Sequence, residues 1–206
     1  MRYGIKISGL SIVQRRAIIR SSIFLKGKNS ASGAFDKFKT RLVAGGDQQD
    51  KGLYENFSSP TASTSSVLTV AVIAASESRS VIIIDIGGAF LNADIAPTGI
   101  QVHMHQMLMQ IDPTYQQYVE SDGSMMVQLD KALYGCVEAA ALWYADLRSK
   151  LEEDGFVANP YDACILNKSG ADGVQITISV HVDDLLVTSS SGTYMVFSLG
   201  ENSLTT

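Results

Sequence analysis

Apolar and polar residues alternate over residues 176–182, and this period of two is typical of a strand with one covered face. A second apolar run follows at residues 185–187, so the two segments predict a β-hairpin with Asp183 and Asp184 at its tip. Aspartate is common in turns for conformational reasons alone. Two adjacent carboxylates also repel each other, however, and a bound divalent cation would relieve that repulsion. The pattern leaves both interpretations open.

Two segments carry apolar residues at helical spacing. A helix is predicted to begin after Ser63 or Thr64, either of which can cap it, and to end near residues 77–78. The longest helix is predicted over residues 138–153, with Gly155 as its C-cap. Its apolar stripe of Trp143, Leu147 and Leu151 predicts a helix that packs on the core.

The apolar run of residues 80–85 predicts a fully buried strand that ends at Asp85. Two glycines follow, and residues 89–92 are expected to form a short helix. An aspartate after a strand is usually a helix cap or a turn former. Capping and metal binding are compatible roles for Asp85.

A second hairpin is predicted near the N-terminus, from strands at residues 22–26 and 35–43 joined by turn-forming residues. Lys37, Lys39 and Arg41 are spaced by two, so their side chains should share one face. A basic stripe of this kind suits phosphate contact, although the same pattern also occurs on solvated sheet faces.

The remaining segments complete an α+β pattern. His103 and His105 alternate in a predicted strand, and we interpret them as exposed strand residues because no cysteine or carboxylate lies near them. Asp112 is expected to open a short helix. Further strands are predicted over residues 100–104, 125–129 and 164–168.

Composition narrows the class of protein. The 206 residues are 46% hydrophobic, which is typical of a globular chain that buries a core. The net charge of -5 gives no overall attraction to nucleic acid, so any such binding would depend on local basic patches. Cys136 and Cys164 lack metal-ligand spacing and are expected to be buried free thiols. No apolar run has signal-peptide character or membrane-spanning length, which favours an intracellular, cytoplasmic protein.

Six stretches, in order along the chain, resemble the reverse transcriptase of copia-type LTR retrotransposons. They are Phe38–Gly46, Phe57–Ala62, Ile84–Asn92, Lys131–Gly135, Ala141–Tyr144 and His181–Leu186. The resemblance implies a polymerase palm-and-fingers fold, with an antiparallel sheet packed against helices and the thumb absent. It places the fingers and palm domain at residues 20–189, between a poorly defined segment (1–19) and a disordered tail (190–206).

The resemblance also implies the chemistry of the site. Asp85, Asp183 and Asp184 match the catalytic, metal-binding carboxylates of the family. These would hold Mg²⁺, or Mn²⁺ in its place, for two-metal nucleotidyl transfer. Lys39 and Arg41 match the positions that hold the incoming triphosphate.

Further family properties concern the substrate and the partners. Phe90 matches the aromatic residue that excludes a ribose 2′-hydroxyl and so selects deoxynucleotides. The implied partners are an RNA or DNA template-primer, deoxynucleoside triphosphates, and other Pol domains such as RNase H and integrase. The implied location within the cytoplasm is a virus-like particle.

The chain departs from the family pattern at three places. Glu138 stands where an amide contacts the nucleotide, and an ionised carboxylate there would repel the triphosphate. His181 replaces a tyrosine, and the residues after Ser189 do not resemble the thumb. Weak primer extension by this chain is therefore expected. Two alternatives stay open: an inactive, degenerate retroelement remnant, or a small α+β metal-binding or interaction domain.

Overall fold

The computed structural model describes residues 11–12, 18–53, 57–102, 110, 112–170 and 173–191. The chain forms two compact units and passes between them three times. Unit 1 combines Met1–Phe57 with Phe90–Leu142, and unit 2 combines Ser58–Ala89 with Trp143–Thr206. Both contain sheet and helix, so the predicted α+β class is confirmed. In the described part of the chain, no helix is both long and apolar enough to cross a bilayer.

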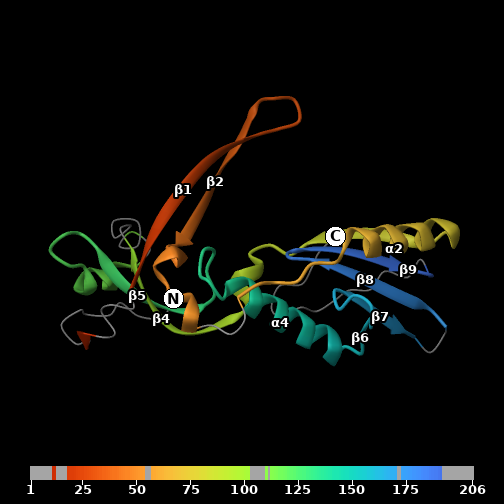
Figure 1. Cartoon of the computed structure of the whole chain (residues 1–206). Coiled ribbons are helices and arrows are strands. Elements are labelled where there is room, and N and C mark those ends of the chain that lie inside the picture. The colour runs from red at the N-terminus through yellow and green to blue at the C-terminus, as the bar shows by residue number, and fades with distance from the viewer. Residues whose placement is uncertain are drawn as a thin grey trace. The chain divides into compact units, whose positions relative to one another are not determined.

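Unit 1 is built on a four-stranded sheet with the order β2-β1-β4-β5 (Figure 1). The strands are β1 (Ile19–Asn29), β2 (Phe35–Ala44), β4 (Asp94–Val102) and β5 (Met125–Lys131). β1 and β4 pair in parallel, and the other two pairs are antiparallel. Short 3₁₀ helices complete the unit: η2 (Gly46–Gln48), η3 (Lys51–Leu53), η4 (Ala89–Asn92, which begins at the unit boundary) and η5 (Pro113–Tyr118).

The predicted N-terminal hairpin is confirmed as β1 and β2, and it is longer than expected. Gly33 has a positive φ of 82° in the turn that joins the strands. At the base of the hairpin, the Ala44 amide donates to the Tyr134 carbonyl (2.7 Å). Close packing of backbone there leaves no room for a side chain on Gly135, because a Cβ would meet the Ala44 carbonyl.

Unit 2 is built on a five-stranded antiparallel sheet with the order β3-β9-β8-β7-β6 (Figure 1). The strands are β3 (Ser80–Asp85), β6 (Val157–Ala158), β7 (Ile165–Ser169), β8 (Gln175–His181) and β9 (Asp184–Ser189). The helices are α2 (Thr64–Ser76) and α4 (Ala139–Glu153). The residues of α4 up to Leu142 belong to unit 1, and the rest of α4 belongs to unit 2.

The helix predictions are confirmed in unit 2. Ser63 caps α2, since its side chain accepts a hydrogen bond from the Ser66 amide. The apolar stripe of α4 is buried, with Trp143, Leu147 and Leu151 each at most 2% exposed. Alternate residues of β8, Ile176, Ile178 and Val180, are also buried. These side chains form the core that the periodicity predicted.

Three strand predictions need correction. The alternation over residues 176–182 predicted a strand with one covered face, but Thr177 and Ser179 are also buried, at 6% and 3% exposed, because β8 is a central strand that is covered on both faces. β3 is not fully buried, because Val81 and Ile83 are 51% and 76% exposed. β3 is the edge strand of its sheet, so alternate side chains lack the cover that a central strand receives. The hairpin tip is Val182–Asp183, since Asp184 already pairs with His181 as the first residue of β9. His103 and His105 lie outside the described residues, as do residues 1–10 and 192–206.

Candidate active site

The three candidate catalytic aspartates lie at the same end of the unit 2 sheet. Asp85 is the last residue of β3, and it pairs directly with Asp184, the first residue of β9. Asp183 occupies the adjoining turn, and its carbonyl accepts a hydrogen bond from the Ile86 amide (2.9 Å). The sheet therefore brings together residues that are 98 and 99 positions apart in the chain (183 and 184 against 85).

The electrostatics of this end of the sheet follow from the register. Residues that face each other in an antiparallel pair have Cβ atoms about 4.5–5.5 Å apart, and like charges there are destabilising. Asp85 and Asp184 form such a pair, and both are exposed. Their carboxylate oxygens are ligands of the kind that Mg²⁺ prefers. Within the described ranges, however, no three His, Cys, Asp or Glu side chains are gathered closely enough to hold a metal by themselves.

The turn that carries Asp183 has an unusual backbone. Val182 has a φ of 60°, which is rare for a β-branched residue. The turn consists of Val182 and Asp183, and only Val182 has a positive φ. A positive φ at the first of two turn residues is typical of a type II′ turn, in which glycine is preferred at that position. The turn therefore stores backbone strain next to a candidate catalytic residue.

Trp143 supports this turn from α4. Its indole Nε1 donates a hydrogen bond to the Val182 carbonyl (2.8 Å), and its side chain is 2% exposed. The apolar spacing of α4 predicted a core position for Trp143 but not this contact. The available signal was its place in the Ala141–Tyr144 stretch, one of those that carry the family resemblance.

In unit 1, the hairpin of β1 and β2 has two chemically different faces. Three cross-strand pairs share the basic face: Phe24 with Arg41, Lys26 with Lys39, and Lys28 with Lys37. All of these residues except Lys37 line one hollow. The other face carries exposed apolar residues, among them Leu25 and Phe38. Lysines that face each other across strands are destabilising unless an anion lies between them. The basic face therefore suits a phosphate-containing ligand.

Tyr134 links two of the candidate substrate-binding residues within unit 1. The Arg41 guanidinium carbon lies 5.7 Å from the centre of the Tyr134 ring, within cation–π range. The Phe90 ring also packs on the Tyr134 ring, at a centroid distance of 4.7 Å and an interplanar angle of 56°. Arg41 and Phe90, which are 49 positions apart (90 against 41), thus contact the same side chain. Tyr134 was not predicted as a site residue, although it lies in the Lys131–Gly135 stretch.

Glu138 has a structural partner that the sequence did not suggest. Its side chain is 7% exposed, and its Oε2 accepts a hydrogen bond from Gln49 Nε2 (3.1 Å). Gln49 Oε1 in turn accepts from the Val137 amide (2.8 Å). Through these two hydrogen bonds, Gln49 connects the loop after β2 to the residues that precede α4, and Glu138 accepts one of them.

Both cysteines are buried free thiols, as predicted. Burial raises the pKa of Cys136 to about 11, opposed by a hydrogen bond at Leu133 and reinforced by the Glu138 charge. Burial also raises the pKa of Cys164, against the effect of its contact with the Tyr144 hydroxyl. Neither thiol is suited to nucleophilic chemistry at neutral pH.

Comparison with known proteins assigns the family. The family described as "Reverse transcriptase (RNA-dependent DNA polymerase)" matches residues 11–198. The chain therefore belongs to this reverse transcriptase family. The match confirms the resemblance that the six sequence stretches predicted.

The relatives are large polyproteins of plant transposons. The chain is 32% identical over 174 residues to the "Retrovirus-related Pol polyprotein from transposon RE1" of Arabidopsis thaliana, covering 84% of the chain and 11% of that protein. It is 28% identical over 152 residues to the corresponding polyprotein from transposon TNT 1-94 of Nicotiana tabacum, covering 73% of the chain and 11% of that protein. No solved structure matches the chain.

Proposed function

We propose that this chain is an RNA-directed DNA polymerase domain that transfers deoxynucleotides to a primer 3′-hydroxyl. The observation that carries the proposal is the position of Asp85, Asp183 and Asp184 at one end of the unit 2 sheet. In this proposal unit 2 is the palm. Unit 1, which contains the basic hairpin, is the fingers.

The three aspartates would hold Mg²⁺, with Mn²⁺ as a substitute. Mg²⁺ is commonly bound by one or two carboxylates, with waters and substrate phosphates as the other ligands. A site that lacks three gathered protein ligands is compatible with that mode of binding. When bound, the cations would supply activation of the primer hydroxyl and neutralisation of the phosphates. The backbone contacts of the turn would keep the Asp183 carboxylate at the end of the sheet.

The substrate roles in unit 1 are proposed residue by residue. Lys39 and Arg41 would bind the triphosphate, since both lie on the basic face of the hairpin. Phe90 would select against a ribose 2′-hydroxyl, and its packing on Tyr134 would keep its ring in place. A template-primer and deoxynucleoside triphosphates are the proposed substrates, and the other Pol domains are the proposed partners.

Glu138 is proposed to lower activity rather than to support it. A carboxylate near a bound triphosphate would oppose the charge neutralisation that the reaction requires. Glutamine has the same shape and retains an oxygen that can accept from Gln49. Glu138→Gln should therefore raise the rate of nucleotide incorporation and leave folding unchanged.

A primer-extension assay with poly(rA)/oligo(dT) tests the proposal. We expect Mn²⁺- or Mg²⁺-dependent extension that Asp183→Asn abolishes. The matched control is Asp154→Asn, which removes the same charge from an exposed ion pair with Lys168 (3.0 Å) and should leave extension unchanged. Extension by Asp183→Asn at the rate of the unmodified chain would refute the assignment of the aspartates. If neither the chain nor Glu138→Gln extends the primer in Mg²⁺ or Mn²⁺, the chain is an inactive remnant.

A further inference from the structure

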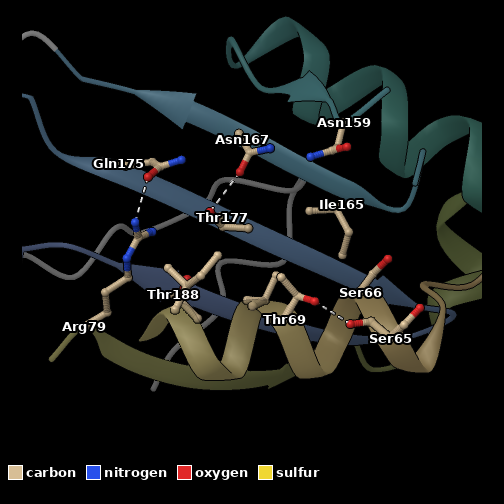
Figure 2. A pocket seen from close by; sticks show the side chains of 12 residues that line it. Ser65, Ser66, Thr69, Arg79, Asn159, Ile165, Asn167, Gln175, Thr177 and Thr188 are labelled. Atoms are coloured by element: carbon tan, nitrogen blue, oxygen red, sulfur yellow. Dashed lines mark hydrogen bonds between the residues drawn. The ribbon is translucent and has the colours of Figure 1, made fainter. Parts of the chain in front are cut away.

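Unit 2 contains a polar cavity that the proposed polymerase reaction does not use. It lies between α2 and strands β7, β8 and β9, and its volume is about 340 Å³ (Figure 2). Ligand pockets typically have volumes of about 300–1,000 Å³, so this cavity has room for a small molecule. Thr188 lies four residues beyond Asp184 in β9, about 13 Å along the strand. None of the three aspartates lines the cavity.

The cavity contains a buried cation. The Arg79 side chain is 5% exposed, and its Nε and Nη2 both contact Glu77 Oε2 (2.8 and 2.7 Å). Nη2 also donates to Gln175 Oε1 (2.7 Å). Within the described residues, Nη1 has no hydrogen-bond partner. A buried guanidinium with unused N–H groups favours an anion or another strong acceptor.

The neighbouring amides also present donors to the cavity. Gln175 Oε1 accepts from Arg79, and Asn159 Oδ1 accepts from the Tyr161 amide (2.9 Å). Asn167 Oδ1 pairs with the Thr177 hydroxyl (2.9 Å). Since all three oxygens are engaged within the protein, the three NH₂ groups remain as donors. Figure 2 shows the amide nitrogens of Asn159 and Asn167 directed toward one another.

Thr188, another residue of the cavity lining, has a buried hydroxyl without a hydrogen-bond partner among the described residues. It is 1% exposed, and its hydroxyl is one of two buried side-chain oxygens that lack a partner in the described part of the chain. A buried hydroxyl without a partner is costly, and Thr188 is one of the residues that line this cavity. Among the described residues that line the cavity, none carries a carboxylate.

From this arrangement we propose that the cavity binds a small oxyanion, with a phosphate group as its ligand chemistry. The Arg79 Nη1 group, the amide NH₂ groups and the Thr188 hydroxyl supply the hydrogen bonds. Glu77 holds the guanidinium in position from the solvent side, where its carboxylate is 54% exposed. This site would bind either a free phosphate ion or the phosphate of a small metabolite.

Titration calorimetry with inorganic phosphate, in EDTA, tests the site without relying on polymerase activity. We expect saturable binding in the millimolar range or tighter. Thr188→Val should weaken phosphate binding about tenfold or more, since it removes one hydrogen bond to a charged ligand. Arg79→Leu should abolish binding. Asp183→Asn should bind phosphate normally, which separates this site from the proposed catalytic one.

Ser179→Ala is the matched control, because the Ser179 hydroxyl is the other buried oxygen without a partner in the described residues and does not line the cavity. It should leave phosphate binding unchanged. Ribose phosphate that binds more tightly than phosphate would identify a metabolite site, and equal affinities would identify a site for the free ion. The absence of saturable binding by either, or equal binding by Thr188→Val and the unmodified chain, would overturn the proposal.

Discussion

The indole of Trp143 donates a hydrogen bond to the carbonyl of Val182, and this contact connects α4 to the turn that carries Asp183. The two residues are 39 positions apart. Val182 has a positive φ, so the hydrogen bond stabilises a backbone conformation that valine rarely adopts. The stability of this turn should therefore depend on both residues.

Trp143→Phe is expected to destabilise unit 2. The substitution keeps an aromatic ring in the core but leaves the Val182 carbonyl without its donor, at a cost of about 1–3 kcal/mol. Urea unfolding measures the loss. Tyr144→Phe, which removes a more exposed hydrogen bond to the Ala163 carbonyl (3.1 Å), is the control and should cost at most about 1 kcal/mol. Equal costs for the two variants would contradict the assigned role of the indole.

Val182→Gly is expected to stabilise the turn. Glycine adopts a positive φ without the strain of about 1–3 kcal/mol that valine bears, although it loses about 0.5–1 kcal/mol in chain entropy. A net gain of about 1 kcal/mol should appear as a higher urea midpoint. Ile178→Gly, at a buried strand position with no such strain, should be strongly destabilising. A loss of stability in Val182→Gly would show that the turn is not strained.

Asp85→Asn is expected to stabilise the fold and to abolish primer extension. The substitution removes like-charge repulsion with Asp184 across the strand pair, which is worth about 0.2–1 kcal/mol. Thermal unfolding at low salt, compared with that of Asp154→Asn, measures the gain. The advantage should shrink as salt screens the charges. Destabilisation of Asp85→Asn at low salt would show that the two carboxylates do not repel each other.

Gly135→Ala is expected to destabilise unit 1 by about 2 kcal/mol or more, because the residue has a φ of 91° and its Cβ would meet the Ala44 carbonyl. Gly33→Ala is the control. Gly33 also has a positive φ, but nothing lies within 4 Å of a Cβ there, so only the cost of about 1 kcal/mol for the backbone should remain. Denaturant unfolding of the two variants separates the steric effect from the conformational one.

The pKa of Cys136 predicts how stability changes at alkaline pH. Burial raises this pKa from 9.0 to about 11, so the folded state favours the protonated thiol. The stabilisation is fully present below the pKa of the unfolded chain and is lost as pH rises from about 9 to 11. Cys136→Ala should therefore flatten the decline in stability over this range. An unchanged slope would show that the thiol does not titrate with folding.

Local sequence patterns were sufficient to predict most elements of this protein. The period of two predicted the hairpin of β8 and β9, and strand-forming runs joined by turn residues predicted the hairpin of β1 and β2. The spacing of Trp143, Leu147 and Leu151 predicted α4. All of these patterns depend on residues a few positions apart. The motifs predicted the family, and they named the aspartates before any geometry was known. The catalytic, substrate and metal roles of the named residues stay predictions.

Tertiary structure decided which of these elements are neighbours. Strand order and register place Asp85 opposite Asp184, and they also put β3 at the edge of its sheet, so that Ile83 is exposed in spite of an apolar sequence. The contacts of Trp143 with Val182 and of Tyr134 with Phe90 likewise join residues that are 39 and 44 positions apart (134 against 90). Hydrogen bonds and burial between distant segments depend on how the chain closes on itself, and no pattern within a single segment contains that information.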